Sequence, residues 1–459
     1  MIARNTVVAL YYALSDLKNG RGRIRAYRHL SRAQWASPEE IAERQGDRLR
    51  LLLSRAVSRV PYYRETAREK GMMPDAAEIR DELKKIPLLT KEILRTRSDD
   101  LRDPDPAPGW YPNTSGGSTG EPVRFVQDAV YEDWDWAVTA LMYGWAGRRL
   151  GEPMVKLWGS EKDIAGGEGD PVSRRIASLE RVSLLNSFLM SDERMRAYAG
   201  AINRLKPVLI EAYAQSVAEF ARYIARAKIP IHSPRGIIST AGVLLPGQKE
   251  TVESLFRCRV FNRYGSREVG NIACECGAHR GLHVDALGKY VEILDDRGEE
   301  CAPGEAGRVV VTVLTNFTMP LIRYEIGDLA VKAAGVCPCG RGLPMLERVS
   351  GRVVDLFRNS AGARVDGEYF THLFYGLDCV ERFQLIQRAI DGIEIRVVLR
   401  GVGGRAAWEQ AFQSLTVGIR RAMGEGCVVR CEIVDRIEPS GSGKYRYTIC
   451  ELPDADCRE

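Results

Sequence analysis

The ten residues TSGGSTGEPV, at positions 114–123, decide how this chain is interpreted. They contain three glycines and four hydroxyl side chains, a composition that favours neither a helix nor a strand. Glycines allow successive backbone N–H groups to point toward one place, and hydroxyls add further donors, so the stretch predicts a loop that binds an anion such as phosphate. The phosphate loop of kinase-like NTPases is excluded, because that loop needs a lysine where Glu121 follows Gly120.

The same ten residues resemble the phosphate loop of the adenylate-forming acyl ligases, which make an acyl-AMP from a carboxylic acid and ATP. The structural alternative is a linker rich in serine and glycine. The residues that would form the loop are Thr114, Ser115, Gly116, Gly117, Ser118, Thr119 and Gly120. The other segments of the chain decide between the two interpretations.

Charge and cysteine content narrow the class of protein. The 459 residues carry a net charge of +5, with 66 basic and 61 acidic side chains, which argues against a dedicated nucleic-acid binder. A chain of this length is expected to form more than one domain. All 11 cysteines lie at or beyond Cys258, so we expect reduced thiols in a cytoplasmic protein rather than a disulfide framework.

The first apolar segment, residues 7–14, is too short to span a bilayer and is followed by no small-residue cleavage site. The sequence therefore predicts neither a transmembrane helix nor a signal peptide. Packing of Val7, Leu10 and Leu14 onto the core is the favoured interpretation. The alternative is contact with an anionic membrane surface, because basic side chains follow at Lys18, Arg21, Arg23 and Arg25.

From about residue 207 strands and helices alternate with short connections, which is typical of an α/β sheet with parallel pairing. The expected strands are residues 207–210, 236–240 and 259–262, and the expected helices are residues 217–225 and 248–256. Parallel strands place a ligand crevice at their carboxyl ends. The segment that follows the last of these strands is therefore expected to be functional.

That segment is YGSREVG, residues 264–270. An acid beside a glycine turn at the mouth of a sheet can hold Mg²⁺ on ATP, so Glu268 is the predicted magnesium ligand. Tyr264 is expected to lie against adenine, with Gly265 and Ser266 beside it. The alternative for Glu268 is an acid that starts a helix on a surface loop.

Two cysteine pairs with nearby histidines predict a tetrahedral zinc site, since thiolate and imidazole are the ligands that zinc prefers. The segments are CECGAHRGLHV, which holds Cys274, Cys276, His279 and His283, and CPCGRGLP, which holds Cys337 and Cys339. Surface thiols or a redox pair are the alternatives. A metal here would hold two loops together, because one pair follows Glu268 and the other follows Asp328.

The segment PLIRYEIGD, residues 320–328, predicts a strand that ends at Arg323-Tyr324, followed by a glycine and Asp328. An aspartate in this position can accept both ribose hydroxyls, and an arginine nearby can meet phosphate or carboxylate. The structural alternative is a buried ion pair between Arg323 and Asp328.

A small α+β domain is predicted beyond residue 355. We expect helices at residues 368–377 and 406–423 and strands at residues 383–387, 393–399 and 428–434. Near its end, PSGSGKYRY places Lys444 on a loop rich in glycine and serine. Such a lysine can balance the negative charge that develops between a carboxylate and the α-phosphate, although a lysine in a polar loop is usually only a solvated turn.

Five segments occur in the order found in adenylate-forming ligases, so the resemblance extends from about residue 35 to the end of the chain. The resemblance is strongest to the phenylacetate-CoA ligase-like branch, which includes relatives from capsule and secondary-metabolite gene clusters. This implies an α/β fold with a large adenylation domain, residues 1–354, that contains parallel sheets and inserted zinc loops. A small mobile α+β lid, residues 355–459, would follow. Three positions depart from the family pattern, namely Arg267 in place of threonine, Val354 in place of the first hinge aspartate, and an arginine displaced by one position to Arg446.

The resemblance also implies residue roles. Lys444, Glu268 and Arg323 would be catalytic, and Asp328 would bind ribose. Further nucleotide contacts are expected from Ala241, Gly242, Tyr264, Gly265, Ser266 and Arg352. The implied zinc ligands are Cys276, His283, Cys337 and Cys339, with Cys274 and His279 as competing ligands. The acid pocket is expected to use Tyr213, Ala214 and the turn of residues 239–242.

The implied reaction has two steps: Mg-ATP and a carboxylic acid give acyl-AMP and pyrophosphate, and rotation of the lid about Asp355 then admits a second nucleophile. That nucleophile is coenzyme A in the enzymes that give the branch its name, and a carrier-protein thiol or an amine is the alternative. A homodimer is possible in such a family. Two other classes compete, namely a zinc-stabilised nucleic-acid binder, which leaves the phosphate loop unexplained, and a catalytically inactive scaffold relative.

Overall fold

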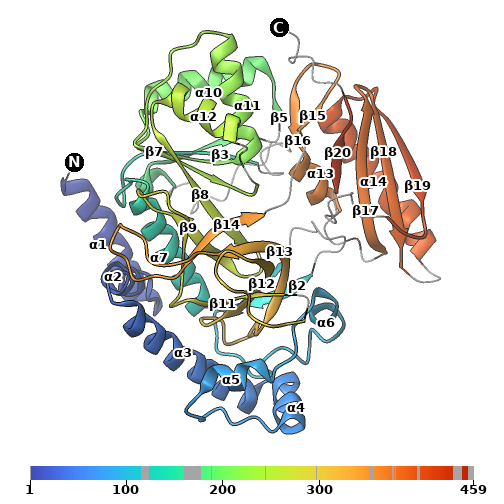
Figure 1. Ribbon diagram of the computed structural model, residues 1–459. Coiled ribbons are helices and arrows are strands. Elements are labelled where there is room, and N and C mark those ends of the chain that lie inside the picture. The colour runs from blue at the N-terminus through green and yellow to red at the C-terminus, as the bar shows by residue number, and fades with distance from the viewer. Residues whose placement is uncertain are drawn as a thin grey trace. The chain divides into compact units, whose positions relative to one another are not determined.

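The structure is a computed structural model that describes residues 2–114, 123–159, 177–187, 189–242, 244, 246–295, 297–350, 356–374, 377, 379–400, 404–437 and 447–452 (Figure 1). The chain divides into two compact units, which are described separately. The first unit comprises Met1–Ser115, Val123–Glu152 and Phe261–Gly351, and the second comprises Gly116–Pro122, Pro153–Val260 and Arg352–Glu459. The domain boundary expected between residues 354 and 355 lies outside the described residues and stays a prediction.

The first unit begins with helices. They are α1 (Ile2–Asn19), α2 (Arg23–Ala33), α3 (Pro38–Arg59), α4 (Pro61–Lys70), α5 (Ile79–Lys84), α6 (Lys91–Thr96) and, after a two-stranded sheet, α7 (Ala129–Trp145). Helix α3 starts at a capping box: the Ser37 hydroxyl accepts the Glu40 N–H, and the Ser37 N–H donates to the Glu40 carboxylate. Local sequence therefore determines where this longest helix begins.

The expected packing of the first helix is wrong. Val8 and Tyr12 face the core, with 0% and 2% of their surface exposed, whereas Val7, Leu10 and Leu14 are more than half exposed. The reason is the helical period: residues 8, 12 and 16 share one face, and Asp16 on that face accepts the backbone N–H of Ile24 at 2.9 Å. The apolar residues of the other face remain on the surface.

An antiparallel sheet forms the rest of the first unit, in the order β11-β12-β13-β14-β10-β9-β8. The bounds are β8 (Arg259–Ser266), β9 (Gly270–Glu275), β10 (Leu282–Val284), β11 (Lys289–Leu294), β12 (Ala306–Val313), β13 (Tyr324–Lys332) and β14 (Met345–Ser350), with β8 beginning in the second unit. A separate pair consists of β1 (Tyr111–Thr114) and β2 (Arg124–Gln127). Leu49, Leu52 and Leu53 of α3 belong to the same buried core as Val309 and Val311 of β12.

Two strand boundaries differ from the prediction. Strand β8 continues to Ser266 because residues 263–266 pair with β9 across a tight turn, so Tyr264 lies within a strand and not after it. Strand β13 starts at Tyr324, where a strand had been expected to end, and Asp328 lies inside it. Antiparallel pairing with β9 extends β8 beyond its apolar run, whereas the apolar residues 320–322 precede β13, whose pairing with β12 begins at Tyr324.

The second unit contains the predicted parallel sheet. Its order is β7-β6-β3-β4, with β3 (Met154–Trp158), β4 (Val182–Asn186), β6 (Leu209–Tyr213) and β7 (Gly236–Thr240), and the three pairings are parallel. Helices α10 (Asp192–Leu205), α11 (Ala214–Arg226) and α12 (Pro246–Phe256) lie close together (Figure 1). They share a core with the sheet through Ile202, Phe220 and Phe256. The alternation of strands and helices in this part of the sequence is confirmed.

The last part of the second unit is the expected small α+β structure. Its sheet has the order β19-β18-β17-β20, with β17 (Val380–Ala389), β18 (Gly392–Leu399), β19 (Val428–Ile433) and β20 (Thr448–Cys450). Helices α13 (Gly367–Leu373) and α14 (Gly404–Met423) accompany it. The rings of Phe374 and Phe383 stack with centroids 3.8 Å apart, and Trp408 of α14 lies beside them. A three-stranded sheet joins β5 (Leu189–Met190) to β15 (Leu356–Arg358) and β16 (Arg364–Asp366).

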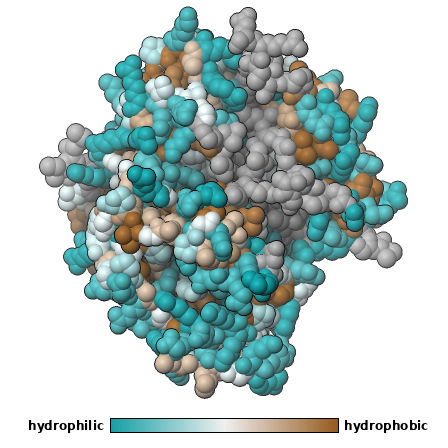
Figure 2. Space-filling view, viewed as in Figure 1, coloured by the Kyte–Doolittle hydropathy of each residue, from teal (hydrophilic) through white to brown (hydrophobic). Residues whose placement is uncertain are grey.

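The surface is mainly hydrophilic on the face shown in Figure 2, where apolar residues form small groups. Within the described part of the chain, no helix combines the length and the apolar character needed to cross a membrane.

Candidate active site and metal site

Two predicted nucleotide residues meet in the first unit. The Tyr264 hydroxyl on β8 donates to Asp328 Oδ2 on β13 at 2.9 Å, although 64 positions separate them in the sequence. Tyr264 is 9% exposed and Asp328 is half-buried. The tyrosine uses one of the carboxylate's several acceptor positions, so the aspartate keeps capacity for the hydroxyls of a ligand.

Glu268 lies in the turn between β8 and β9 and is buried, with 6% of its surface exposed. Its carboxylate accepts a long hydrogen bond, 3.4 Å, from the Tyr324 hydroxyl on β13. Both predicted acids therefore lie within reach of tyrosines that connect the β8–β9 turn to β13. A surface loop that starts a helix, the alternative for Glu268, does not form.

Residues that the sequence analysis missed hold this turn in place. Gln127 of β2 donates through Nε2 to the carbonyl oxygen of Arg267 at 3.0 Å. Asp135 of α7 accepts the N–H of Asn271 at 2.9 Å. Gly270 has φ +69°, and a Cβ there would lie 2.4 Å from the Asp135 carboxylate, so glycine is required. Gln127 and Asp135 lie more than 130 positions from Glu268 in the sequence, so no local pattern connects them with it.

Arg323 occupies a buried structural position. Its guanidinium forms a two-bond contact with Glu292, at 3.0 and 3.2 Å, and donates to the carbonyl oxygens of Lys84 and Ile86. The buried ion pair considered as an alternative exists, but its acid is Glu292 and not Asp328. Burial raises the pKa of Glu292, and the neighbouring Arg323 opposes that shift. These contacts use four of the five guanidinium N–H groups, and the catalytic role of Arg323 stays a prediction.

Thr114 ends strand β1 and pairs with Arg124 of β2. Its N–H donates to the Asn113 side chain at 2.9 Å, and Asn113 in turn donates to Gln127. The two ends of the predicted phosphate loop are therefore adjacent, and they share Gln127 with the Glu268 turn. Ser115, Gly116, Gly117, Ser118, Thr119 and Gly120 lie outside the described residues, as do Arg352, Asp355 and Lys444.

The remaining predicted positions lie in the second unit. Ala241 and Gly242 follow β7, and Ala241 has φ +56°. A Cβ at Gly242 would meet the Cβ of Ala214 at 3.4 Å, so this turn lies against the start of α11. Tyr213 is buried and packs with Trp158, their ring centroids being 4.4 Å apart. The roles of these residues in binding stay predictions.

Four side chains from three loops and strands converge in the first unit in a group that can hold a metal ion. The potential ligand atoms of Cys276, His283, Cys337 and Cys339, here named the Cys/His cluster, all lie within 4.8 Å of one another. Cys276 Sγ is 3.7 Å from Cys337 Sγ, and Cys339 Sγ is 3.3 Å from His283 Nε2. Two sulfur ligands of tetrahedral zinc are about 3.8 Å apart, given Zn–S bonds of about 2.3 Å. The donor set and the spacing fit this ion.

Burial shifts the pKa values of side chains in the Cys/His cluster. Burial raises the pKa of Cys276 to about 12 and lowers that of His283 to about 4. Burial also opposes ionisation of Cys339, but hydrogen bonds from Arg341, Cys337 and Cys276 together lower the pKa of that thiol. An imidazole held neutral is suited to coordination, and a bound cation would drive the thiols to thiolates.

The competing ligands are engaged elsewhere. Cys274 is fully buried among apolar residues around α7, and His279 contacts the Glu275 carboxylate at 3.3 Å and the ring of Phe261. Arg341, between the second cysteine pair and β14, donates to Gln34, which also accepts from Trp145 beside His283. The loop that carries two of the potential ligands is thus attached to the helices of the first unit.

Comparisons with known proteins find relatives by sequence and by fold. Residues 357–451 match the CapK C-terminal domain family. The phenylacetate-coenzyme A ligase of Thermus thermophilus is 26% identical over 338 residues, which cover 69% of this chain and 72% of the relative. Protein CapK of Staphylococcus aureus is 23% identical over 273 residues, 58% of either chain. The solved structure of a 2-hydroxyisobutyryl-CoA ligase with 2-HIB-AMP and CoA shares the fold, with a TM-score of 0.59 and 18% identity over 91% of each chain.

The chain therefore has the fold of a CoA ligase, and the class that this fold and the predicted site point to is that of the adenylate-forming ligases. Its relatives by sequence are phenylacetate-coenzyme A ligases and CapK.

Proposed function

We propose that the protein activates a carboxylic acid as its acyl-AMP and transfers the acyl group to coenzyme A. The observation that supports the proposal most is the bond between Tyr264 and Asp328, because it joins the predicted adenine and ribose residues at one place. The similarity to phenylacetate-coenzyme A ligases supports coenzyme A as the acceptor. An amine or a carrier-protein thiol is the alternative acceptor.

In the first step a carboxylate oxygen of the acid attacks the α-phosphorus of Mg-ATP, and the bond to the β-phosphate oxygen breaks, releasing pyrophosphate. Asp328 accepts the ribose hydroxyls, and Tyr264 both orients that carboxylate and lies against adenine. Glu268 binds the magnesium ion of Mg-ATP, and the loop from Thr114 to Gly120 binds the β- and γ-phosphates of the nucleotide. Lys444 balances the charge that develops as the two anions meet.

In the second step the coenzyme A thiolate attacks the acyl carbonyl, the C–S bond forms, and AMP leaves with the electrons of the C–O bond. The residues around Asp355 would act as the hinge that admits the thiol. Arg323 takes a structural part in this scheme, because Glu292 and two carbonyl oxygens already occupy four of its five donors.

We also propose that the Cys/His cluster binds structural zinc. Four protein ligands complete a tetrahedral shell, so the ion would supply cross-linking and no open position for chemistry. Cys276 follows β9, and Cys337 and Cys339 precede β14. Zinc would therefore hold together the segments that follow Glu268 and Asp328.

The test is acid-dependent pyrophosphate release from Mg-ATP with aryl, fatty and amino acids, each without acceptor and then with coenzyme A or hydroxylamine. We expect Lys444→Ala to lower the rate about 10²- to 10³-fold. Lys70→Ala, an exposed lysine in α4, is the matched control and should retain the rate. Release that depends on the acid, with a thioester formed from coenzyme A, supports the proposal. ATP binding without release for any acid would overturn it in favour of a scaffold.

A further inference from the structure

Helix α1 carries a row of apolar side chains on the face turned away from the core. Val7, Leu10, Tyr11, Leu14 and Leu17, here named the α1 stripe, are 53%, 56%, 40%, 58% and 83% exposed. They repeat at spacings of three and four, so they line one side of the helix. Soluble proteins rarely leave a contiguous apolar row of this kind uncovered, and such a surface usually marks a contact with a partner or a membrane.

A basic concavity lies between α2 and α3. It has a volume of about 730 Å³ and is here named the basic cavity. Its lining includes Arg25, Arg28, His29, Arg32, Trp35 and Arg44. Among the residues that the structure describes, none forms an ion pair with any of these four arginines. The single acid in the lining, Glu40, already accepts the N–H of Ser37.

The character of the basic cavity suits phosphate groups. Burial and the charges of Arg48 and Arg44 lower the pKa of His29, as expected for an imidazole beside cations. Trp35 is 53% exposed, and the Arg341 guanidinium lies 4.6 Å from its ring centre. Exposed tryptophan and tyrosine are enriched where proteins meet the headgroup region of a bilayer, and Tyr11 of the α1 stripe is of the same kind.

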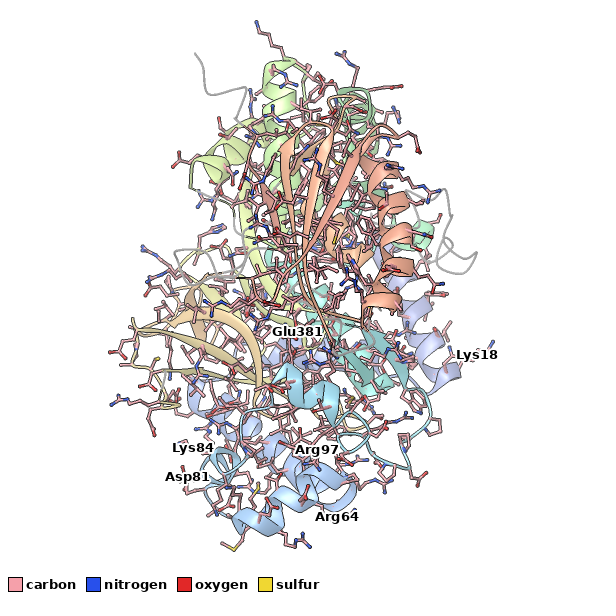
Figure 3. All side chains as sticks on the ribbon, turned by 90° about the vertical axis from the view of Figure 1, so that its right-hand side faces the viewer. Lys18, Arg64, Asp81, Lys84, Arg97 and Glu381 are labelled. Carbon is pink, nitrogen blue, oxygen red and sulfur yellow. The ribbon has the colours of Figure 1, made fainter. Side chains whose placement is uncertain are left out.

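The α1 stripe and the basic cavity lie on helices that follow one another in the chain. Residues 20–22 connect α1 to α2, and Arg23 forms an ion pair with Asp16 at 2.7 Å. Figure 1 shows α1, α2 and the start of α3 together at one edge of the first unit. Figure 3 shows Lys18, at the end of α1, with its side chain directed away from the ribbon. Apolar and cationic groups are therefore presented from adjoining elements.

We propose that α1 and the basic cavity bind the surface of an anionic membrane. The α1 stripe inserts between acyl chains while the helix lies in the plane of the interface, and the arginines of the basic cavity bind lipid phosphates. A second copy of the chain explains the surface less well, because a contact through the apolar α1 stripe would leave the arginines of the basic cavity without anionic partners. A free phosphate ligand would leave the apolar row unexplained.

Co-sedimentation with lipid vesicles tests the proposal on the full chain. We expect the protein to sediment with vesicles of equal parts phosphatidylglycerol and phosphatidylcholine, and to stay in solution with phosphatidylcholine alone. Leu10→Ser with Leu14→Ser should weaken vesicle binding at least about tenfold. Arg28→Gln with Arg32→Gln should weaken it about fivefold for each charge at low salt, with the wild-type affinity falling as salt rises.

The controls match each change elsewhere on the surface. Val417→Ser removes an exposed apolar side chain from α14, and Arg64→Gln with Arg68→Gln removes two charges from α4. Both should bind vesicles as the wild type does, and thermal unfolding should show that every variant is folded. Absence of binding to anionic vesicles would overturn the proposal. Equal weakening by test and control variants would also overturn it, as would a dimer in sedimentation velocity that the α1 substitutions dissociate without vesicle binding.

Discussion

The Cys/His cluster and the nucleotide residues are two places where distant segments meet, but their polar groups are satisfied differently. Cys276 and His283 are fully buried, and the donor atoms of the cluster converge on one another. Asp328 and Glu268 each accept a hydrogen bond from a tyrosine and keep further acceptor capacity. The ligand atoms of the cluster therefore surround a point where a cation could bind, whereas the predicted nucleotide residues are held by the tyrosines in the absence of a ligand.

This difference separates stability from activity. Removal of a metal ligand should cost folding free energy first and activity only as a result. Removal of a nucleotide contact should cost ligand binding and leave folding nearly unchanged. Pairs of variants can test this separation between effects on folding and effects on ligand binding.

The largest effect is expected at the Cys/His cluster. Cys276→Ser should lower the zinc content and reduce the free energy of unfolding by about 5 kcal/mol, because metal binding and folding are coupled at a closed site. Metal analysis of the purified protein and thermal unfolding are the measurements. Cys258→Ser changes a half-buried thiol outside the cluster and should leave the zinc content unchanged. Loss of zinc without a change in stability would contradict the structural role.

Arg323 tests whether an arginine next to the nucleotide residues acts on substrate or on the fold. Arg323→Ala leaves the buried Glu292 carboxylate without its cation and should lower the free energy of unfolding by about 3–5 kcal/mol. The KM for ATP of the folded enzyme should remain close to the wild-type value. Arg323→Ala with Glu292→Gln removes both charges and should recover part of the lost stability. A large loss of kcat at unchanged stability would instead support the catalytic role predicted from sequence.

Much of the fold was predictable because local signals and global packing agree. The capping residue Ser37, the alternation of apolar strands and amphipathic helices in residues 207–262, and the α+β pattern beyond residue 356 all depend on short-range periodicity. The error at α1 has the same origin. An apolar row at helical spacing predicts that one face is buried, but it does not show whether the row or the neighbouring face with Val8 and Tyr12 meets the core.

The residue types of the candidate site could be predicted from the sequence, but most of the residues that contact them could not. Glycines, hydroxyls, acids and cysteines at particular spacings pointed to nucleotide and metal chemistry. The partners that position them are ordinary residues, and their roles arise from tertiary contacts. Gln127 donates to the carbonyl oxygen of Glu268, 141 positions further along the chain. Asp135 accepts the N–H of Asn271, 136 positions further along. The choice of Glu292 as the partner of Arg323 likewise depends on two strand pairings, β11 with β12 and β12 with β13, which no local pattern reveals.

The smallest effects are expected at the bond between Tyr264 and Asp328, where they discriminate best between binding and folding. Tyr264→Phe removes one hydroxyl and keeps the ring, so the KM for ATP should rise about fivefold, equivalent to about 1 kcal/mol. Asp328→Asn should raise it further, because the amide offers one acceptor oxygen where the carboxylate offers two. Stability should change by less than about 1 kcal/mol in both variants.

Tyr198→Phe is the control for the loss of a hydroxyl, since Tyr198 donates to the carbonyl oxygen of Asn186 in the second unit. It should leave the KM for ATP unchanged. If Tyr264→Phe also left the KM for ATP unchanged, then the hydrogen bond to Asp328 would stabilise the β-sheet without affecting ATP binding. Tyr264 and Asp328 would then have a structural role, like the Cys/His cluster. If KM rose while stability held, then the tyrosine would be shown to position the aspartate for ribose. That outcome would separate the two regions by function, as their different burial and bonding predict.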